Sequence, residues 1–163
     1  MILSWFGRKN ADFGPGFYLT PGRDFAYRWA AAGNIINEYE LDLNGLEVKN
    51  FEHSEEWFSY IFNNRRASDN ITADVVIGPV ANDTIFETFG IITSGFLAPK
   101  DALSLLMIGP EYIQVALKTE KAASALIWIS SSVLKENPEN AENIEKTKEE
   151  YEIQFAEAMK KIS

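Results

Sequence analysis

Residues 73–80 read ADVVIGPV, and this run constrains the fold more than any other stretch of the chain. After Asp74 it is continuously apolar and rich in β-branched residues, a pattern typical of a short strand buried on both faces. Gly78 and Pro79 end the strand, because glycine and proline weaken regular pairing. A second strand is predicted at residues 111–118, EYIQVALK, whose side chains alternate. We therefore expect both segments to supply central strands of one mixed sheet.

Polar side chains at these two strands are candidate ligand groups. Gln114 lies on the more polar face of its strand, and it is either an exposed strand glutamine or part of a binding site. Asn82 and Asp83 follow the buried strand, where ligand groups often gather, although the same residue types cap helices. Both alternatives stay open for each of these residues.

The segment DFGPGFYLTP, residues 12–21, reads as a glycine turn followed by a short strand. Thr20 and Pro21 then favour the start of a helix that ends at Gly33. Gly16 allows the backbone to approach a neighbour or a ligand closely. The strand can simply be buried, or it can form the wall of a ligand pocket.

Further elements follow from turn and cap signals. Residues 34–51 predict two strands, joined in a tight hairpin by Asn44 and Gly45. Ser54 caps a predicted helix, and Thr119 caps another that reads EKAASALIWI. Two more helices are predicted at residues 82–95 and 99–108. Strands and helices mix without a regular βαβ repeat, so the sequence predicts the α+β class.

The C-terminal segment has a different composition, rich in Glu, Lys and Asn from Pro138 onward. One amphipathic helix is predicted there, with a narrow apolar stripe formed by Ile144, Tyr151, Phe155, Met159 and Ile162. We expect residues 1–135 to form one domain and residues 136–163 to form a helical extension. The stripe docks either on its own domain or on a protein partner, which includes a second copy of the chain.

Composition excludes several classes of site. The 163 residues carry a net charge of −9, which disfavours binding to the nucleic-acid backbone. There is no cysteine and a single histidine, His53, so disulfides, thiolate sites and multi-histidine metal sites are excluded. No apolar run has the length of a signal peptide or membrane span, so we expect a cytoplasmic protein without membrane contact, or an effector exported without a signal.

Three motifs occur in a specific order: DFGPGFYLT, DVVIGPVANDTIF and IQVALKTEKA. Together they resemble a bacterial family of uncharacterised domains in the ADP-ribosyltransferase superfamily, over residues 10–127. Trp29-Ala30 and Ser94-Gly95 also fit the family pattern. The resemblance implies a split, mixed β core with flanking helices around a cleft that binds NAD as substrate. The activity it implies is transfer of ADP-ribose to a macromolecule or nucleoside, as in a toxin or effector.

The resemblance also implies roles for residues. Tyr18 matches the strand whose aromatic side chain stacks on nicotinamide, and Gln114 matches the strand whose polar group contacts the ribose. These two are the predicted catalytic residues. Predicted NAD-binding residues lie in the first two motifs: Gly16, Phe17, Tyr18, Thr20, Asn82 and Asp83. Tyr18 is expected to face the cleft while Phe17 and Leu19 face the core.

The chain departs from the family pattern in two places. Family members begin with a strand reading Y-H-G-S, whereas MILSWFGRKNA precedes Asp12 here. Gln114 stands where classical transferases carry a glutamate, and an amide cannot act as a general base. The alternatives are an NAD-dependent enzyme and a catalytically degenerate module of the same fold that acts by binding a partner. A protein without a ligand pocket is disfavoured by the ordered motifs.

Overall fold

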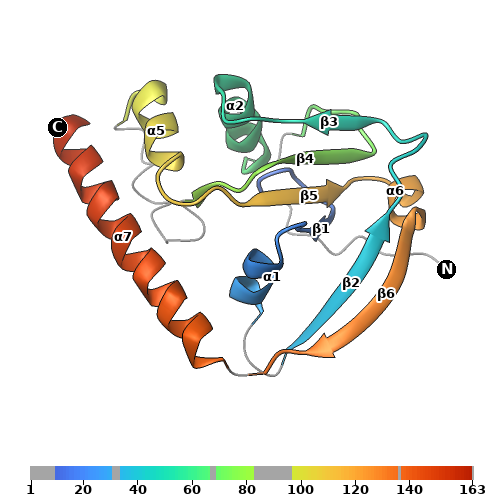
Figure 1. Cartoon of the computed structure of the whole chain (residues 1–163). Helices are drawn as coiled ribbons and strands as arrows, with labels where there is room; N and C mark the ends of the chain where they lie inside the picture. Colours follow the sequence, from blue (N-terminus) through green and yellow to red (C-terminus); the bar gives the residue numbers. More distant parts are fainter. Residues whose placement is uncertain (1–9, 31–33, 67–68, 83–96, 136, 163) are drawn as a thin grey trace. The chain divides into compact units, whose positions relative to one another are not determined.

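The structure, a computed structural model, describes residues 10–30, 34–66, 69–82, 97–135 and 137–162 (Figure 1). The chain divides into two compact units. Unit 1 comprises Met1–Pro79 and Tyr112–Glu136, and unit 2 comprises Val80–Glu111 and Asn137–Ser163. Two sheets and five helices occur in the described part of the chain, which confirms the predicted α+β class.

A four-stranded mixed sheet forms the centre of unit 1. Its order is β1 (Phe17–Leu19), β5 (Ile113–Leu117), β4 (Val75–Pro79) and β3 (Val48–Asn50). Strands β3 and β4 are parallel, whereas β5 pairs antiparallel with both β1 and β4. The two segments predicted as central strands are β4 and β5, and both are central.

The second sheet of unit 1 is a two-stranded antiparallel ribbon of β2 (Ile35–Leu41) and β6 (Leu126–Val133) (Figure 1). Its register shifts between Glu38 and Tyr39, where a bulge interrupts the ladder. The predicted helix EKAASALIWI is therefore wrong beyond its first turn. Thr119 does cap a helix, α6 (Glu120–Ser124), but the following β-branched and aromatic residues pair with β2.

The predicted hairpin at Asn44 and Gly45 is also wrong, although the turn forms. Leu46 N donates to Leu43 O at 3.2 Å, and Gly45 has a φ of 75°. The two flanking strands then separate, because β2 pairs with β6 and β3 pairs with β4. Apolar side chains beside the turn pack into the core between the sheets, and this burial outweighs local pairing.

Both faces of β4 are covered, as its apolar sequence predicts. One face carries Val75 and Ile77 and packs with the apolar residues of β5 and of the ribbon. The other face carries Val76 and Gly78, and it packs against α2 (Glu55–Asn64) and the aromatic rings of Phe13 and Phe51. Ser54 caps α2 by accepting a hydrogen bond from Trp57 N at 3.2 Å.

Helix α1 (Arg23–Trp29) begins later than expected. Gly22 occupies its N-cap position, and no side chain caps it. The hydroxyl of Thr20, predicted as the cap, instead donates to Ile113 O at 2.8 Å and so ties β1 to β5. Phe25 anchors the helix by stacking on Tyr112, with 4.4 Å between ring centroids.

Unit 2 contains α5 (Pro99–Leu106) and α7 (Pro138–Ile162), which contact each other. The predicted stripe of α7 is confirmed as its inward face, because Tyr151 and Phe155 are buried and stack at 5.7 Å. The predicted helix at residues 82–95 falls, after Asn82, outside the described residues. Among the described helices, none is both long and apolar enough to cross a membrane.

Candidate functional site

A cleft of about 700 Å³ opens between the ribbon and the four-stranded sheet of unit 1. Its floor is apolar and comes from strands of both sheets: Leu19, Leu41, Ile77, Val115 and Leu126. These residues also belong to the core, so the cleft is an unfilled continuation of the space between the sheets. Helix α1 closes one side with Arg23, Ala26 and Tyr27.

The rim of the cleft is polar. Arg23 of α1 lies 3.8 Å from Glu38 of β2, and Ser130 of β6 donates to the same carboxylate at 3.3 Å. Both charged side chains are more than half exposed, so water screens the ion pair. A ligand that enters the cleft can therefore displace this pair at little cost and meet one cation and one carboxylate.

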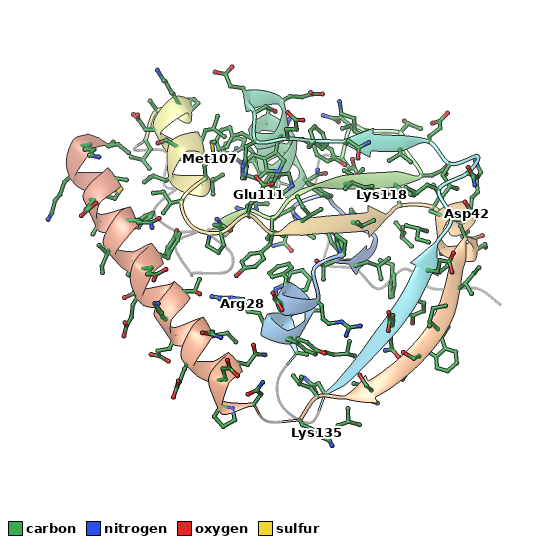
Figure 2. All side chains as sticks on the ribbon, in the orientation of Figure 1. Arg28, Asp42, Met107, Glu111, Lys118 and Lys135 are labelled. Carbon is green, nitrogen blue, oxygen red and sulfur yellow. The ribbon has the colours of Figure 1, made fainter. Side chains whose placement is uncertain are left out.

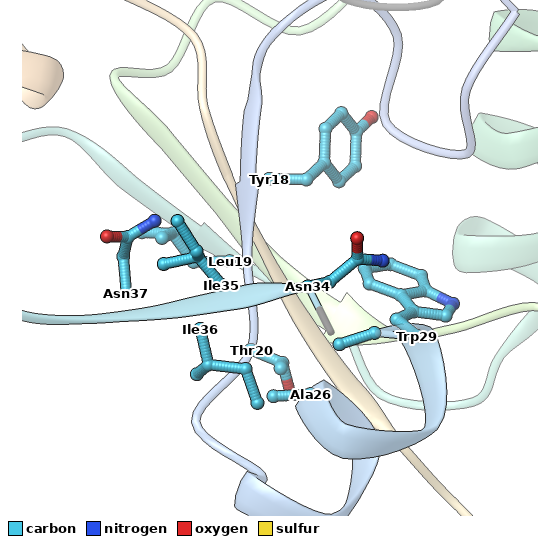
Figure 3. A pocket seen from close by; sticks show the side chains of 10 residues that line it. Tyr18, Leu19, Thr20, Ala26, Trp29, Asn34, Ile35, Ile36 and Asn37 are labelled. Carbon is cyan, nitrogen blue, oxygen red and sulfur yellow. The ribbon is translucent and has the colours of Figure 1, made fainter. Parts of the chain in front are cut away.

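A second cavity of about 410 Å³ lies beside the first, and Leu19, Thr20 and Ala26 line both. Figure 3 shows Tyr18 and Trp29 on one side of it, with Asn34 between them at the start of the ribbon. Two aromatic side chains and one amide are groups that can hold a planar, polar ring.

Tyr18, a predicted catalytic residue, lines this smaller cavity, but its hydroxyl is engaged. The hydroxyl donates to Gly14 O at 2.7 Å and accepts from Phe13 N at 3.0 Å. Burial raises the pKa of the Tyr18 phenol well above its ordinary value, so the group stays neutral. What Tyr18 can offer a ligand is its ring face.

Gln114, the other predicted catalytic residue, shares a sheet face with Tyr18. Strand register pairs Tyr18 with Ala116, and Gln114 is two residues further along β5, a diagonal neighbour. Its side chain is 3% exposed, and its Nε2 donates to Asp12 Oδ2 at 3.0 Å and to Pro79 O at 3.3 Å. Gln114 is thus buried and hydrogen-bonded rather than an exposed strand glutamine.

A buried ion pair fixes the acceptor of this amide. Arg65 donates to Asp12 Oδ1 from Nη2 at 2.6 Å and from Nε at 3.1 Å. Since Asp12 and the Pro79 carbonyl can only accept from the amide, Nε2 must face them. Gln114 lines neither cavity, because the cleft is lined by the adjacent Val115, which points to the opposite face of β5.

The other predicted residues of the first motif have distinct surroundings. At Gly16, an added Cβ would lie 2.8 Å from Leu117 O, so close pairing of β1 with β5 requires the glycine. Phe17, expected in the core, is 44% exposed and meets Tyr39 edge-on, because β1 is a short edge strand. Thr20 lines both cavities.

Asn82 belongs to unit 2. Its amide Nδ2 donates to Ile108 O at 2.5 Å and to Pro110 O at 3.3 Å, which braces the loop after α5. Asp83 lies outside the described residues. Asn82 is 1% exposed, and within the described residues its Oδ1 has no hydrogen-bond partner.

Sequence reasoning missed Arg23 and Glu38, the charged pair at the rim. The signal for Glu38 was its position two residues after Ile36 in a predicted strand, since residues at that spacing lie on the same face and both line the cleft. The signal for Arg23 was weaker, because one arginine in a first helical turn is common. In the part of the chain that the structure describes, no three acidic or histidine side chains gather as metal ligands.

Residues 4–128 match the model of the family described as "Protein of unknown function (DUF3990)". The chain belongs to this family. The match spans all three sequence motifs and both sheets except the end of β6, and it leaves α7 outside. Searches of curated proteins and of solved structures gave no match.

Proposed function

We propose that this DUF3990 chain is an ADP-ribosyltransferase-like protein that binds NAD in the cleft of unit 1. The cleft itself carries the proposal, because a floor shared by two sheets and a rim with one arginine and one glutamate suit a dinucleotide. Its volume of about 700 Å³ lies within the ordinary range for small-molecule sites.

The residues present fit the parts of NAD as follows. Arg23 supplies the cation for the pyrophosphate, and Glu38 accepts hydrogen bonds from ribose hydroxyls. The ring of Tyr18 offers a face to nicotinamide, whose positive charge favours an aromatic neighbour. Gln114 lies on the face of β5 opposite to the cleft-lining Val115, so it contacts no ligand there and instead holds Asp12 in place behind the sheet.

The reaction we propose is transfer at the nicotinamide ribose. The bond between C1′ and the nicotinamide nitrogen breaks, and nicotinamide leaves as a neutral ring with the bonding electrons. A nucleophilic atom of the acceptor forms the new bond to C1′ and loses its proton to a base. Glu38 is the cleft residue that can take this proton. The acceptor is a macromolecule or nucleoside, and the setting is that of a cytoplasmic toxin or effector.

The burial of Gln114 favours a second candidate, a module of the same fold that binds without turnover. Its amide is nearly inaccessible and committed to Asp12 and Pro79. An amide also supplies no negative charge to a developing oxocarbenium ion. In this candidate the cleft holds the nucleotide, and the protein acts through a partner.

Release of nicotinamide from ring-labelled NAD separates the two candidates. If the protein is a transferase, we expect saturable binding of NAD and release of free nicotinamide. Glu38→Gln should then lower the rate of nicotinamide release more than the affinity for NAD. The module predicts binding without release. Absence of both would contradict the proposal in either form.

Tyr18 needs a paired comparison, because it also braces the glycine turn. Tyr18→Phe keeps the ring and loses the two hydrogen bonds of the hydroxyl, whereas Tyr18→Leu loses the ring as well. Ring stacking predicts that NAD affinity falls in Tyr18→Leu and survives in Tyr18→Phe. Equal losses of NAD affinity in the two variants would mean that Tyr18 only stabilises the glycine turn through its hydroxyl and does not stack on the ligand.

A further inference from the structure

The turn between β2 and β3 contains Asn44 followed by Gly45, and no other asparagine of the sequence precedes a glycine. Both residues are exposed. An asparagine before a glycine is chemically labile, because the backbone nitrogen of the second residue can attack the side-chain amide of the first. Glycine favours this attack, since it has no Cβ to obstruct it. Whether the reaction occurs in the folded protein depends on the structure of the turn.

The attacking nitrogen is not engaged by the described residues. Asn44 N donates to Asp42 Oδ1 at 2.9 Å, and Leu46 N donates to Leu43 O at 3.2 Å. The N–H of Gly45, which lies between these two donors, has no hydrogen-bond partner in the described part of the chain. Because this N–H is bonded to water and not to the fold, it can lose its proton and approach the side chain.

The amide that is attacked is equally accessible. No described residue forms a hydrogen bond with the side chain of Asn44. Nothing lies within 4 Å of a Cβ added at Gly45, so a ring has space to close there. Two other asparagines are held by contrast, since Asn37 Oδ1 accepts from Ser131 Oγ at 2.6 Å and Asn64 is only 1% exposed.

We propose that Asn44 is a site of spontaneous deamidation in the folded protein, and that the isoaspartate product disturbs the packing of the turn. The only co-reactant is water. This proposal is independent of NAD binding, since it needs the turn and not an occupied cleft.

The reaction proceeds in two steps. The deprotonated nitrogen of Gly45 attacks Cγ of Asn44, and the bond from Cγ to the amide nitrogen breaks. That nitrogen takes up a proton and leaves as ammonia, so a cyclic succinimide remains. Water then adds to one of the two ring carbonyls: opening at Cγ gives aspartate, and opening at the backbone carbonyl gives isoaspartate.

The products differ from asparagine in charge and in backbone length. Each adds one carboxylate to a chain whose net charge is already −9. Isoaspartate also places Cβ in the main chain, which lengthens the turn between Leu43 and Leu46. Leu43 lines the cleft and Leu46 packs against the core, so a longer turn should displace one of these side chains and lower the stability.

Ion-exchange chromatography of the purified, folded chain during incubation at mildly alkaline pH tests the proposal, with peptide mapping to locate the change. Wild type should accumulate an acidic species that maps to Asn44. Deamidation there should be at least about tenfold faster than at any other asparagine, a difference of about 1.4 kcal/mol in activation free energy. The separated isoaspartate form should melt at a lower temperature than fresh protein.

Gly45→Ala is the matched variant, because its Cβ meets no neighbour yet obstructs the attack, so deamidation should slow by about tenfold or more. Asn44→Gln is a second variant that must close a larger ring, and it should give no acidic species. Circular dichroism checks that both variants fold. The proposal is wrong if Asn44 stays unchanged in the folded chain, or if Gly45→Ala reacts as fast as wild type. An isoaspartate form that melts at the wild-type temperature would refute the effect on packing.

Discussion

The amide of Gln114 donates to Asp12 Oδ2 at 3.0 Å, although 102 residues separate the two in the chain. Through this bond the glycine-rich segment at the start of the first motif is tied to the central strand β5. Arg65 on the far side of Asp12 completes a buried set of three polar side chains. The three sequence motifs thus meet in space, since Pro79 of the second accepts from Gln114 of the third.

Asp12→Ala tests this relationship through stability. The substitution leaves the buried guanidinium of Arg65 without its carboxylate, so we expect a loss of about 3–5 kcal/mol in the free energy of unfolding. Gln114→Ala keeps the ion pair and should cost less, about 1–3 kcal/mol. Urea denaturation measures both values. A smaller loss for Asp12→Ala than for Gln114→Ala would mean that the ion pair does not organise the segment.

Comparison of Gly14 with Gly45 tests whether crowding around Gly14, in addition to its backbone conformation, requires a glycine there. Both have positive φ, at 72° and 75°, but only Gly14 is crowded, with Asp69 Oδ2 2.9 Å from the position of an added Cβ. Gly45→Ala should cost about 1–2 kcal/mol from the backbone alone. Gly14→Ala should cost about 1–3 kcal/mol more, because packed groups must move. Thermal unfolding compares the two, and equal losses would refute the crowding argument.

Asp74 makes part of the free energy of unfolding depend on pH in the acidic range. Its carboxylate accepts from Glu47 N at 2.9 Å and from Thr119 Oγ1 at 2.7 Å, and Lys121 lies 3.2 Å away. These bonds, led by that from Glu47, lower the pKa of Asp74 from 3.8 to about 2. The stabilisation is therefore present above pH 3.8 and is lost as the pH falls toward 2.

Asp74→Asn should be less stable than wild type at pH 7, and the difference should shrink as the pH falls from 4 to 2. Unfolding by urea at several pH values measures this convergence. A constant difference would show that Asp74 has its ordinary pKa in the folded protein.

Phe155 tests the packing of α7. It is 9% exposed and stacks on Tyr151, so Phe155→Ala should lower the stability of unit 2 by about 3–5 kcal/mol. Ile153→Ala, on the exposed side of the same helix, should change stability little. Helix content followed during thermal unfolding gives the comparison. If Phe155→Ala instead changes the mass in light scattering while stability is unaltered, the stripe docks on a partner.

Sequence patterns predicted those elements whose signals are local. The buried strand 75–79, the caps at Ser54 and Thr119, and the stripe of α7 each depend on residues within a few positions of one another. The ribbon was missed for the opposite reason. Strand β6 pairs with a strand some 90 residues away, and nothing in its own alternation distinguishes a strand from a continuing helix.

The candidate site shows the same division. Tyr18 and Thr20 were found because a dense motif surrounds them, and both line cavities. Arg23 and Glu38 meet only because α1 and β2 face the same cleft, a relation of tertiary structure. Gly16 stays a predicted NAD-binding residue, and the close approach of β1 to Leu117 O also requires a glycine there.

Titration of NAD into the purified chain tests the central claim most directly. A bulky side chain at Ser132 would fill the cleft, whereas Ser124 lines neither cavity. We predict saturable binding to wild type and to Ser124→Trp, with a gain of about 2.7 kcal/mol in stability at a hundredfold excess over the Kd. Ser132→Trp should show neither saturable binding of NAD nor the gain in stability. A site with a binding free energy of about −4 kcal/mol is half-saturated at about 1 mM NAD. If wild type gives neither binding heat nor a shift in melting temperature at that concentration, the account is contradicted.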